Sequence, residues 1–173
     1  LHLSLRRQRQ MCIRDSLSDA VFPFAGEIFG PQFTLDRHPL TAQFFRRTLK
    51  DLVQTLMPTK AHFARPRPYE LSAEVKPVLA PPMGESYPSG HTMDAYLSAI
   101  LLARMVPEKR DELFARAAAA GQSRVVAGVH YPTDLEGGRI SAVALAVELL
   151  HNPEALDDFN RARRELRATL ALD

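Results

Sequence analysis

The chain of 173 residues has one cysteine and no tryptophan. A single cysteine excludes a disulfide within the chain, so disulfides cannot supply the framework of the fold. No stretch without a charged residue exceeds nine residues, whereas a membrane-spanning helix needs about 20 apolar residues. We therefore predict no membrane span. The net charge of +2 is too small to indicate a nucleic-acid partner, so we predict none.

The sequence also lacks the alternation of apolar and polar residues that indicates a β-strand, and it contains no internal repeat. Its hydrophobic fraction of 46% is ordinary for one globular domain of this length. These features predict an all-α protein, a single-domain helical bundle. Residues 19–35 are expected to be irregular or briefly helical, and residues 71–84, which hold three prolines, to form a loop over the mouth of the site.

Apolar residues at helical spacing begin at Leu40 and predict a helix with one buried face. That face would hold Phe44, Phe45, Leu49, Leu52, Val53 and Leu56. Further helices are predicted over residues 92–105, from Pro107 to about Gly121, over residues 142–150 and from Pro153 onward. The helix over residues 142–150 is apolar almost all round, which is typical of a central helix. In the last helix we expect four residues to face inward: Leu156, Phe159, Leu166 and Leu170.

A histidine and an aspartate stand four residues apart at one predicted helix start. Pro132 favours a helix that begins there, and Thr133 to Glu136 has the form of a capping box, so His130 should lie in the loop just before the helix. Asp134 could then accept a hydrogen bond from one imidazole nitrogen, fix the tautomer and leave the other nitrogen free to attack. By itself this spacing is more typical of a surface pair or a cap.

Two other segments carry groups that bind anions. Ser89-Gly90-His91 precedes an apolar run, so it would present backbone N–H groups and a hydroxyl at the positive end of a helix. Lys60 offers a mobile charge, whereas Arg67, between two prolines, and Arg124 offer rigid donor forks. Each segment alone has an ordinary explanation as a turn, a cap or a solvated charge. Together they indicate a site for a small anionic substrate.

The three segments resemble the three-part signature of type-2 phosphatidic acid phosphatases, vanadium haloperoxidases and bacterial class A non-specific acid phosphatases. The matching parts are Lys60 to Arg67-Pro68, then Pro88-Ser89-Gly90-His91, then Ser123-Arg124 to His130 to Asp134. Phrases such as Ser86-Tyr87-Pro88-Ser89-Gly90-His91-Thr92 and His151-Asn152-Pro153 are most similar to the class A acid phosphatases.

This resemblance implies a role for each matching residue. His130 would be the nucleophile, oriented by Asp134, and His91 the general acid and base. The phosphate oxygens would be held by Lys60, Arg67, Ser89, Gly90 and Arg124. No metal and no other cofactor would be needed, because the cations neutralise the phosphate. An acid pH preference is expected, since one imidazole must be charged while the other is neutral.

The resemblance also implies a setting for the enzyme. We expect hydrolysis of phosphate monoesters, with phosphotransfer to alcohols also permitted, inhibition by phosphate or vanadate, a homodimer, and a periplasmic or secreted location. Three alternatives stay open: a vanadate-dependent haloperoxidase, a lipid or pyrophosphate phosphatase of the same superfamily, and a phosphate-binding protein without catalysis. A zinc or manganese site is disfavoured, because Lys and Arg would repel the cation.

Other parts of the sequence have no place in the predicted site. His38, His62 and His151 have no matched partner, so cap or surface roles are expected for them. Residues 1–18 contain a basic cluster without the apolar core of a signal peptide, and Met11 to Ser16 resembles translated adapter sequence. We predict that residues 1–18 are a non-native or disordered leader and that residues 19–173 form the catalytic domain.

Overall fold

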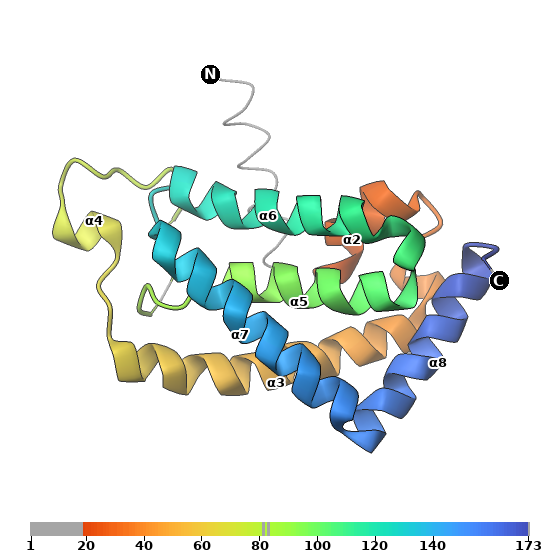
Figure 1. Cartoon of the computed structure of the whole chain (residues 1–173). Helices are drawn as coiled ribbons and strands as arrows, with labels where there is room; N and C mark the ends of the chain where they lie inside the picture. The colour runs from red at the N-terminus through yellow and green to blue at the C-terminus, as the bar shows by residue number, and fades with distance from the viewer. Residues whose placement is uncertain (1–18, 81, 83, 173) are drawn as a thin grey trace.

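The structure, a computed structural model, describes residues 19–80, 82 and 84–172. In this part every regular element is a helix (Figure 1), so the all-α prediction is confirmed. The α-helices are α2 (Val21–Phe29), α3 (Pro39–Phe63), α4 (Pro68–Leu71), α5 (Gly90–Met105), α6 (Arg110–Val126), α7 (Pro132–His151) and α8 (Pro153–Thr169), with 3₁₀ turns at Leu35–Arg37 and Pro107–Lys109. The leader prediction for residues 1–18 lies outside the described residues.

Helix α5 is the centre of the bundle. It packs along α6 and α7 and also contacts α3 and α8 (Figure 1). Leu101, Leu102 and Met105 of this helix are fully buried. The prediction that residues 142–150 form the central helix is wrong, because Val143 and Val147 of α7 are 44% and 47% exposed. Both helices are apolar almost all round, and this pattern does not say which of the two the other helices will cover.

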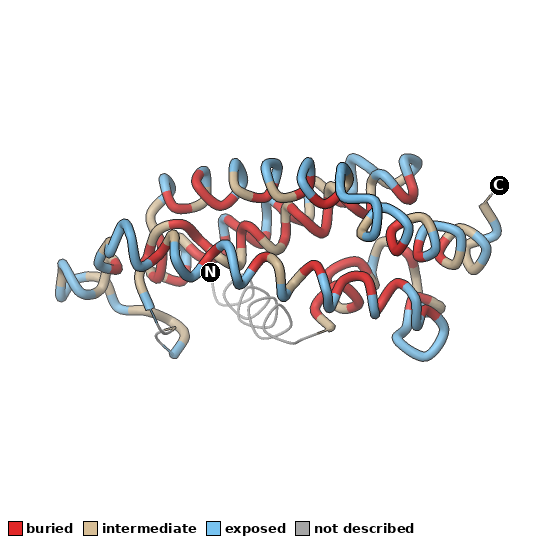
Figure 2. Tube along the Cα trace, turned by 90° about the horizontal axis from the view of Figure 1, so that it is seen from below, coloured by how far each residue is buried: buried red, intermediate tan, exposed pale blue. Residues whose placement is uncertain are grey.

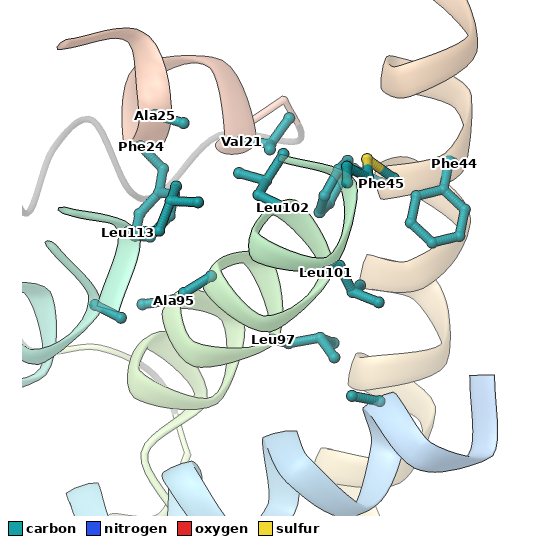
Figure 3. Packing of buried hydrophobic residues seen from close by; sticks show 14 of the residues in the cluster. Val21, Phe24, Ala25, Phe44, Phe45, Ala95, Leu97, Leu101, Leu102 and Leu113 are labelled. Atoms are coloured by element: carbon teal, nitrogen blue, oxygen red, sulfur yellow. The ribbon is translucent and has the colours of Figure 1, made fainter. Parts of the chain in front are cut away.

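The apolar core joins α2, α3 and α6 to the faces of α5 (Figure 3). Figure 2 shows that buried residues follow the inward sides of the helices. Two predicted core residues, Val53 and Leu156, are exposed instead. Val53 lies about 100° around α3 from the buried Leu52, which turns it off the inward face. Leu156 lies in the first turn of α8, beside the bend from α7.

The helix boundaries agree with the sequence at most ends. Helix α3 ends at Phe63, before Pro66 as predicted, where Ala64 turns into the left-handed region with a φ of 44°. Helix α6 continues past the predicted end near Gly121 to Val126, so Arg124 lies on a helix. Gly121 does not stop this helix; a Cβ there would lie 3.3 Å from the side chain of Thr92. This glycine therefore serves the close packing of α5 and α6.

Two glycines of α7 let it approach the turn before α5. A Cβ on Gly137 would lie 2.4 Å from the ring of Tyr87, and one on Gly138 would lie 2.6 Å from the backbone oxygen of Ser89. Because backbone contacts cannot yield as a flexible side chain can, only glycine at position 138 permits this distance. The pair therefore sets the spacing between the start of α5 and α7.

We predict that Gly138→Ala destabilises the protein by roughly 1–3 kcal/mol, because the added methyl group overlaps the Ser89 backbone. Gly26→Ala is the matched control: Gly26 lies inside α2, and its Cβ would meet nothing within 4 Å. This substitution should stabilise by up to about 1 kcal/mol, since alanine favours helix. Denaturant unfolding of both variants measures the difference. Equal effects would contradict the close approach.

Candidate active site

His130 lies in the short connection between α6 and α7, and Asp134 lies in the first turn of α7. The Asp134 carboxylate accepts the backbone N–H of Tyr131 at 2.9 Å and so caps α7. The predicted capping box between Thr133 and Glu136 is wrong, because Pro132 takes the first helical position and makes Tyr131 the N-cap. Glu136 instead pairs with Arg139 on the outer face of α7.

The imidazole of His130 and the carboxylate of Asp134 form a buried pair, with Nδ1 3.1 Å from Oδ2. Burial alone would raise the pKa of Asp134, but hydrogen bonds from His130, Ser86 and the Tyr131 backbone hold that pKa below its usual value. The carboxylate is therefore ionised and can only accept. Nδ1 of His130 must carry the proton in this hydrogen bond.

Arg67 faces the other nitrogen of the same imidazole. Its Nη1 lies 3.3 Å from Nε2 of His130 and donates to the Val129 carbonyl oxygen at 2.8 Å, while its Nε donates to the Gly84 carbonyl oxygen at 2.8 Å. Because a guanidinium has no acceptor, Nε2 contributes a lone pair to the contact. The two neighbours of His130 thus select one tautomer.

Three cations are buried around this imidazole: Lys60, Arg67 and Arg124. Lys60 donates to the Glu85 carbonyl oxygen at 2.5 Å, and burial, followed by repulsion from Arg67, lowers its pKa to about 8. Arg124 is 4% exposed, and its Nε has no hydrogen-bond partner among the described residues. Buried cations of this kind are stabilised by an anion. The cluster is therefore suited to a tetrahedral oxyanion.

The start of α5 closes the cluster. Ser89 is the N-cap of α5, its hydroxyl accepts the N–H of Thr92 at 3.3 Å, and its own N–H donates to the Asp134 backbone oxygen at 3.0 Å. Gly90 and His91 form the first turn of α5. Burial, and then the positive charge of the groups around it, lowers the pKa of His91 to about 3. The groups concerned are Arg124, His130, Arg67 and Lys60, in that order.

The structure thus gathers the predicted site residues, although the segments that carry them are far apart in the sequence. Residues from α3, the 64–67 segment, α5, α6 and α7 meet around His130. His62 and His151 lie apart from it and are exposed. His38 occupies the N-cap position of α3, but its side chain makes no capping hydrogen bond and is buried beside Phe33 rather than on the surface.

Two residues that contact Asp134 were not predicted. The hydroxyl of Ser86 donates to Oδ2 at 2.5 Å, and Nη1 of Arg65 donates to Oδ1 at 2.8 Å. One signal was present: Arg65 and Ser86 belong to the same segments as Arg67 and Ser89, which the motifs place around Asp134, and a carboxylate in such a site needs a donor for each oxygen. Sequence spacing alone does not say which of these residues turn toward Asp134.

The predicted loop over the site begins one residue later than expected, since Leu71 ends α4. Val78 N–H donates to the Ala127 carbonyl oxygen at 3.2 Å, so the loop rests on the connection that carries His130. A cavity of about 750 Å³ lies elsewhere, between α3, α7 and the start of α8, and contains none of the predicted site residues. Within the described ranges no three His, Cys, Asp or Glu side chains are grouped to hold a metal ion.

One known protein family matches most of this chain. The profile of the PAP2 superfamily matches residues 41–157, about two thirds of the chain. The chain belongs to the PAP2 superfamily. The match includes every residue of this PAP2 site, from Lys60 to Asp134. No helix in the described part of this PAP2 chain is both long and apolar enough to cross a membrane.

Curated bacterial proteins are also similar to this PAP2 chain. It is 39% identical over 80 residues to a non-specific acid phosphatase of Providencia stuartii and 37% identical over 81 residues to one of Salmonella typhi. An acid phosphatase of Zymomonas mobilis is 35% identical over 81 residues. These alignments cover 46–47% of this chain and 31–32% of the relatives. The chain thus matches about a third of the length of these relatives.

We predict that anion binding to this PAP2 site depends on pH through Lys60 and His91. Sulfate suits the test, because its charge is constant across the range. As the pH rises through about 8, Lys60 of the free protein loses its proton and sulfate affinity should fall. In the free protein His91 is neutral above about pH 3. A bound anion should raise the pKa of His91, so affinity should increase as the pH falls from neutral.

Isothermal calorimetry across this pH range, with NMR of the His91 imidazole, measures both effects. Lys60→Met should remove the loss of affinity near pH 8. Lys50→Met is the matched control, since Lys50 is exposed on α3, and it should keep that loss. An affinity independent of pH, or an alkaline loss that persists in Lys60→Met, would contradict the prediction.

Proposed function

We propose that this PAP2 protein is a metal-independent acid phosphatase that hydrolyses phosphate monoesters through a phosphohistidine at His130. The observation that carries the proposal is the position of the His130 ring: Nδ1 lies 3.1 Å from Oδ2 of Asp134, and Nε2 lies 3.3 Å from Nη1 of Arg67, so an ionised carboxylate and a guanidinium favour the tautomer with a lone pair on Nε2. A nucleophilic nitrogen therefore faces the cations that would hold the phosphate. The similarity to bacterial acid phosphatases supports the same reaction class.

In the first step, Nε2 of His130 forms a bond to phosphorus as the bond from phosphorus to the ester oxygen breaks. The electron pair of that bond leaves with the alkoxide oxygen, which takes the proton of His91. Asp134 stabilises the positive charge that develops on the His130 ring through the Nδ1 hydrogen bond. The products are the free alcohol, a neutral His91 and a phosphohistidine.

In the second step, neutral His91 removes a proton from water while the water oxygen attacks phosphorus. The bond from phosphorus to Nε2 breaks, and its electron pair returns to His130. When phosphate leaves, His91 loses this proton to solvent, because the cations of the free site keep its imidazole neutral. An alcohol in place of water would give phosphotransfer by the same route.

The cations can do what a metal ion does in other phosphatases. Lys60, Arg67 and Arg124 are buried, and a charge in a low-dielectric site acts more strongly than one in water. Ser89 and the Gly90 amide at the start of α5 would bind further phosphate oxygens. The same cations keep His91 neutral in the free protein. His91 would therefore gain its proton together with the substrate, which favours turnover at acid pH.

The proposal includes the setting of the reaction. We propose that residues 19–173 form the catalytic domain, that small phosphorylated molecules are the substrates, and that phosphate or vanadate inhibits by occupying the site. A homodimer and a periplasmic or secreted location belong to the same proposal. The bacterial origin of the similar proteins supports this setting.

A panel of phosphomonoesters at acid pH, with and without EDTA, tests the proposal. We expect phosphate release that EDTA leaves unchanged, and an acid-labile, alkali-stable phosphoprotein after rapid quenching. Loss of activity with EDTA and its rescue by a divalent cation would show metal catalysis instead. Binding of phosphate without release from any ester would indicate a binding protein, and halide oxidation that requires vanadate and exceeds phosphatase turnover would indicate a haloperoxidase.

A second prediction separates the roles of the two histidines. His130→Ala should abolish the phosphoprotein and turnover of every ester. His91→Ala should lower kcat for alkyl phosphates about 10²–10⁴-fold, because their poor leaving groups need a proton. For p-nitrophenyl phosphate the loss in the first step should be far smaller, since nitrophenolate leaves without one.

Burst-phase kinetics with the two ester classes measure this first step separately from hydrolysis of the intermediate. His62→Ala is the control, because His62 is exposed outside the cluster, and it should behave as the wild type. Equal losses on alkyl and nitrophenyl esters in His91→Ala would refute the general-acid role.

A further inference from the structure

Arg65 lies against the oxygen of Asp134 that His130 does not use. Its Nη1 donates to Oδ1 of Asp134 at 2.8 Å and to the Thr133 hydroxyl at 2.7 Å. Its guanidinium carbon lies 4.1 Å from the ring centre of Tyr131. Arg65 is therefore bound to residues on both sides of Pro132, next to His130, and its side chain is 36% exposed.

The chain between α3 and α4 explains how two arginines reach the same pair. Arg65 and Arg67 each precede a proline, which favours an extended backbone. Side chains two residues apart in an extended chain project to the same side. Arg67 thereby reaches Nε2 of His130, and Arg65 reaches the carboxylate that holds Nδ1. The two guanidinium groups contact opposite ends of the His130–Asp134 pair.

We propose that Arg65 is a positioning residue that fixes the Asp134 carboxylate and weakens its pull on the His130 proton. A carboxylate that shares its charge with a guanidinium attracts a neighbouring imidazolium less strongly. Nε2 of His130 consequently keeps its lone pair at a lower pH than it would beside an unshared carboxylate. The inference deepens the proposed function, on which it rests, because a histidine nucleophile must be neutral at acid pH to attack.

The other charged and titratable groups that face His130 are unchanged when Arg65 is replaced. They are Lys60 from α3, Arg67 before α4, His91 from α5, Arg124 from α6 and Asp134 from α7. Burial lowers the pKa of His130, Asp134 opposes that shift, and Arg67 and Lys60 add to it. Removal of the Arg65 charge should strengthen the attraction between Asp134 and a protonated His130. The titration midpoint of His130 should therefore move to higher pH.

The test compares Arg65→Gln, which keeps a donor but loses the charge, with Arg65→Lys, which keeps the charge. In Arg65→Gln we expect the His130 midpoint, followed by NMR, to rise by about 0.5–1 pH unit. The acid limb of kcat/KM for p-nitrophenyl phosphate should move by the same amount, with kcat at low pH reduced more than KM is changed. Arg65→Lys should titrate close to the wild type.

Arg139→Gln is the matched control, since it removes one positive charge from the exposed face of α7. It should leave the His130 midpoint and the pH profile unchanged. Arg65→Met removes the guanidinium that lies over the Tyr131 ring but keeps a long apolar side chain there, and it is measured in the same way, so the comparison does not depend on the folding of Arg65→Gln.

An unchanged His130 midpoint in both neutral variants would overturn the inference. So would an equal loss of kcat at every pH with a lower Tm and no shift, because that pattern is expected of a purely structural ion pair. The NMR titration also separates this inference from the proposed function. If the wild type releases no phosphate and forms no phosphohistidine, the proposed function fails, and the midpoints still decide whether Arg65 acts on His130.

Discussion

The buried carboxylate of Asp134 is the contact on which the site geometry depends. Its side chain accepts from His130, Ser86, Arg65 and the Tyr131 backbone, and its carbonyl oxygen accepts the N–H of Ser89. One residue thus joins the segment after α3, the turn before α5 and the start of α7. Burial of an ionised carboxylate costs several kcal/mol unless hydrogen-bond donors surround it. The burial of Asp134 therefore requires that the segments carrying its donors lie together. The same hydrogen bonds decide which nitrogen of His130 is free.

The apolar bundle makes this arrangement possible because its closely packed helices exclude water from the site. Helix α5 contacts α3, α6, α7 and α8, and Gly138 lets α7 approach the backbone of Ser89 closely. The cations consequently lie where screening by water is weak. Three of them, Lys60, Arg67 and Arg124, are buried beside one buried carboxylate, so the site carries excess positive charge. These cations repel one another, and a bound dianion relieves that repulsion. Binding of a dianion is therefore more favourable than it would be at a neutral site.

Features that depend on neighbouring residues in the sequence were predicted from it, whereas contacts between distant residues were not. Helices with local signals, such as α3 from Pro39 and α5 from the Ser89 cap, agree with the structure within a few residues. The signature motifs also named residues that the fold brings together. The ranking of α5 over α7 as the central helix was not predicted, since the covering of a helix depends on the other helices. Arg65 and Ser86 were missed for the same reason: their contacts with Asp134 span 69 and 48 residues.

The two imidazoles of the site face the same cations, but different neighbours set the pKa of each. Burial lowers the pKa of both, yet Asp134 opposes that shift at His130, whereas repulsion from Arg124, His130, Arg67 and Lys60 adds to it at His91. The proposed reaction needs a neutral nucleophile at His130 and a protonated acid at His91, and in the free protein these shifts suit only His130. A phosphate dianion reverses the balance at His91, because it neutralises the cations that repel the imidazolium. The acid would then be charged only while an ester occupies the site, so the proton would arrive together with the leaving group that needs it.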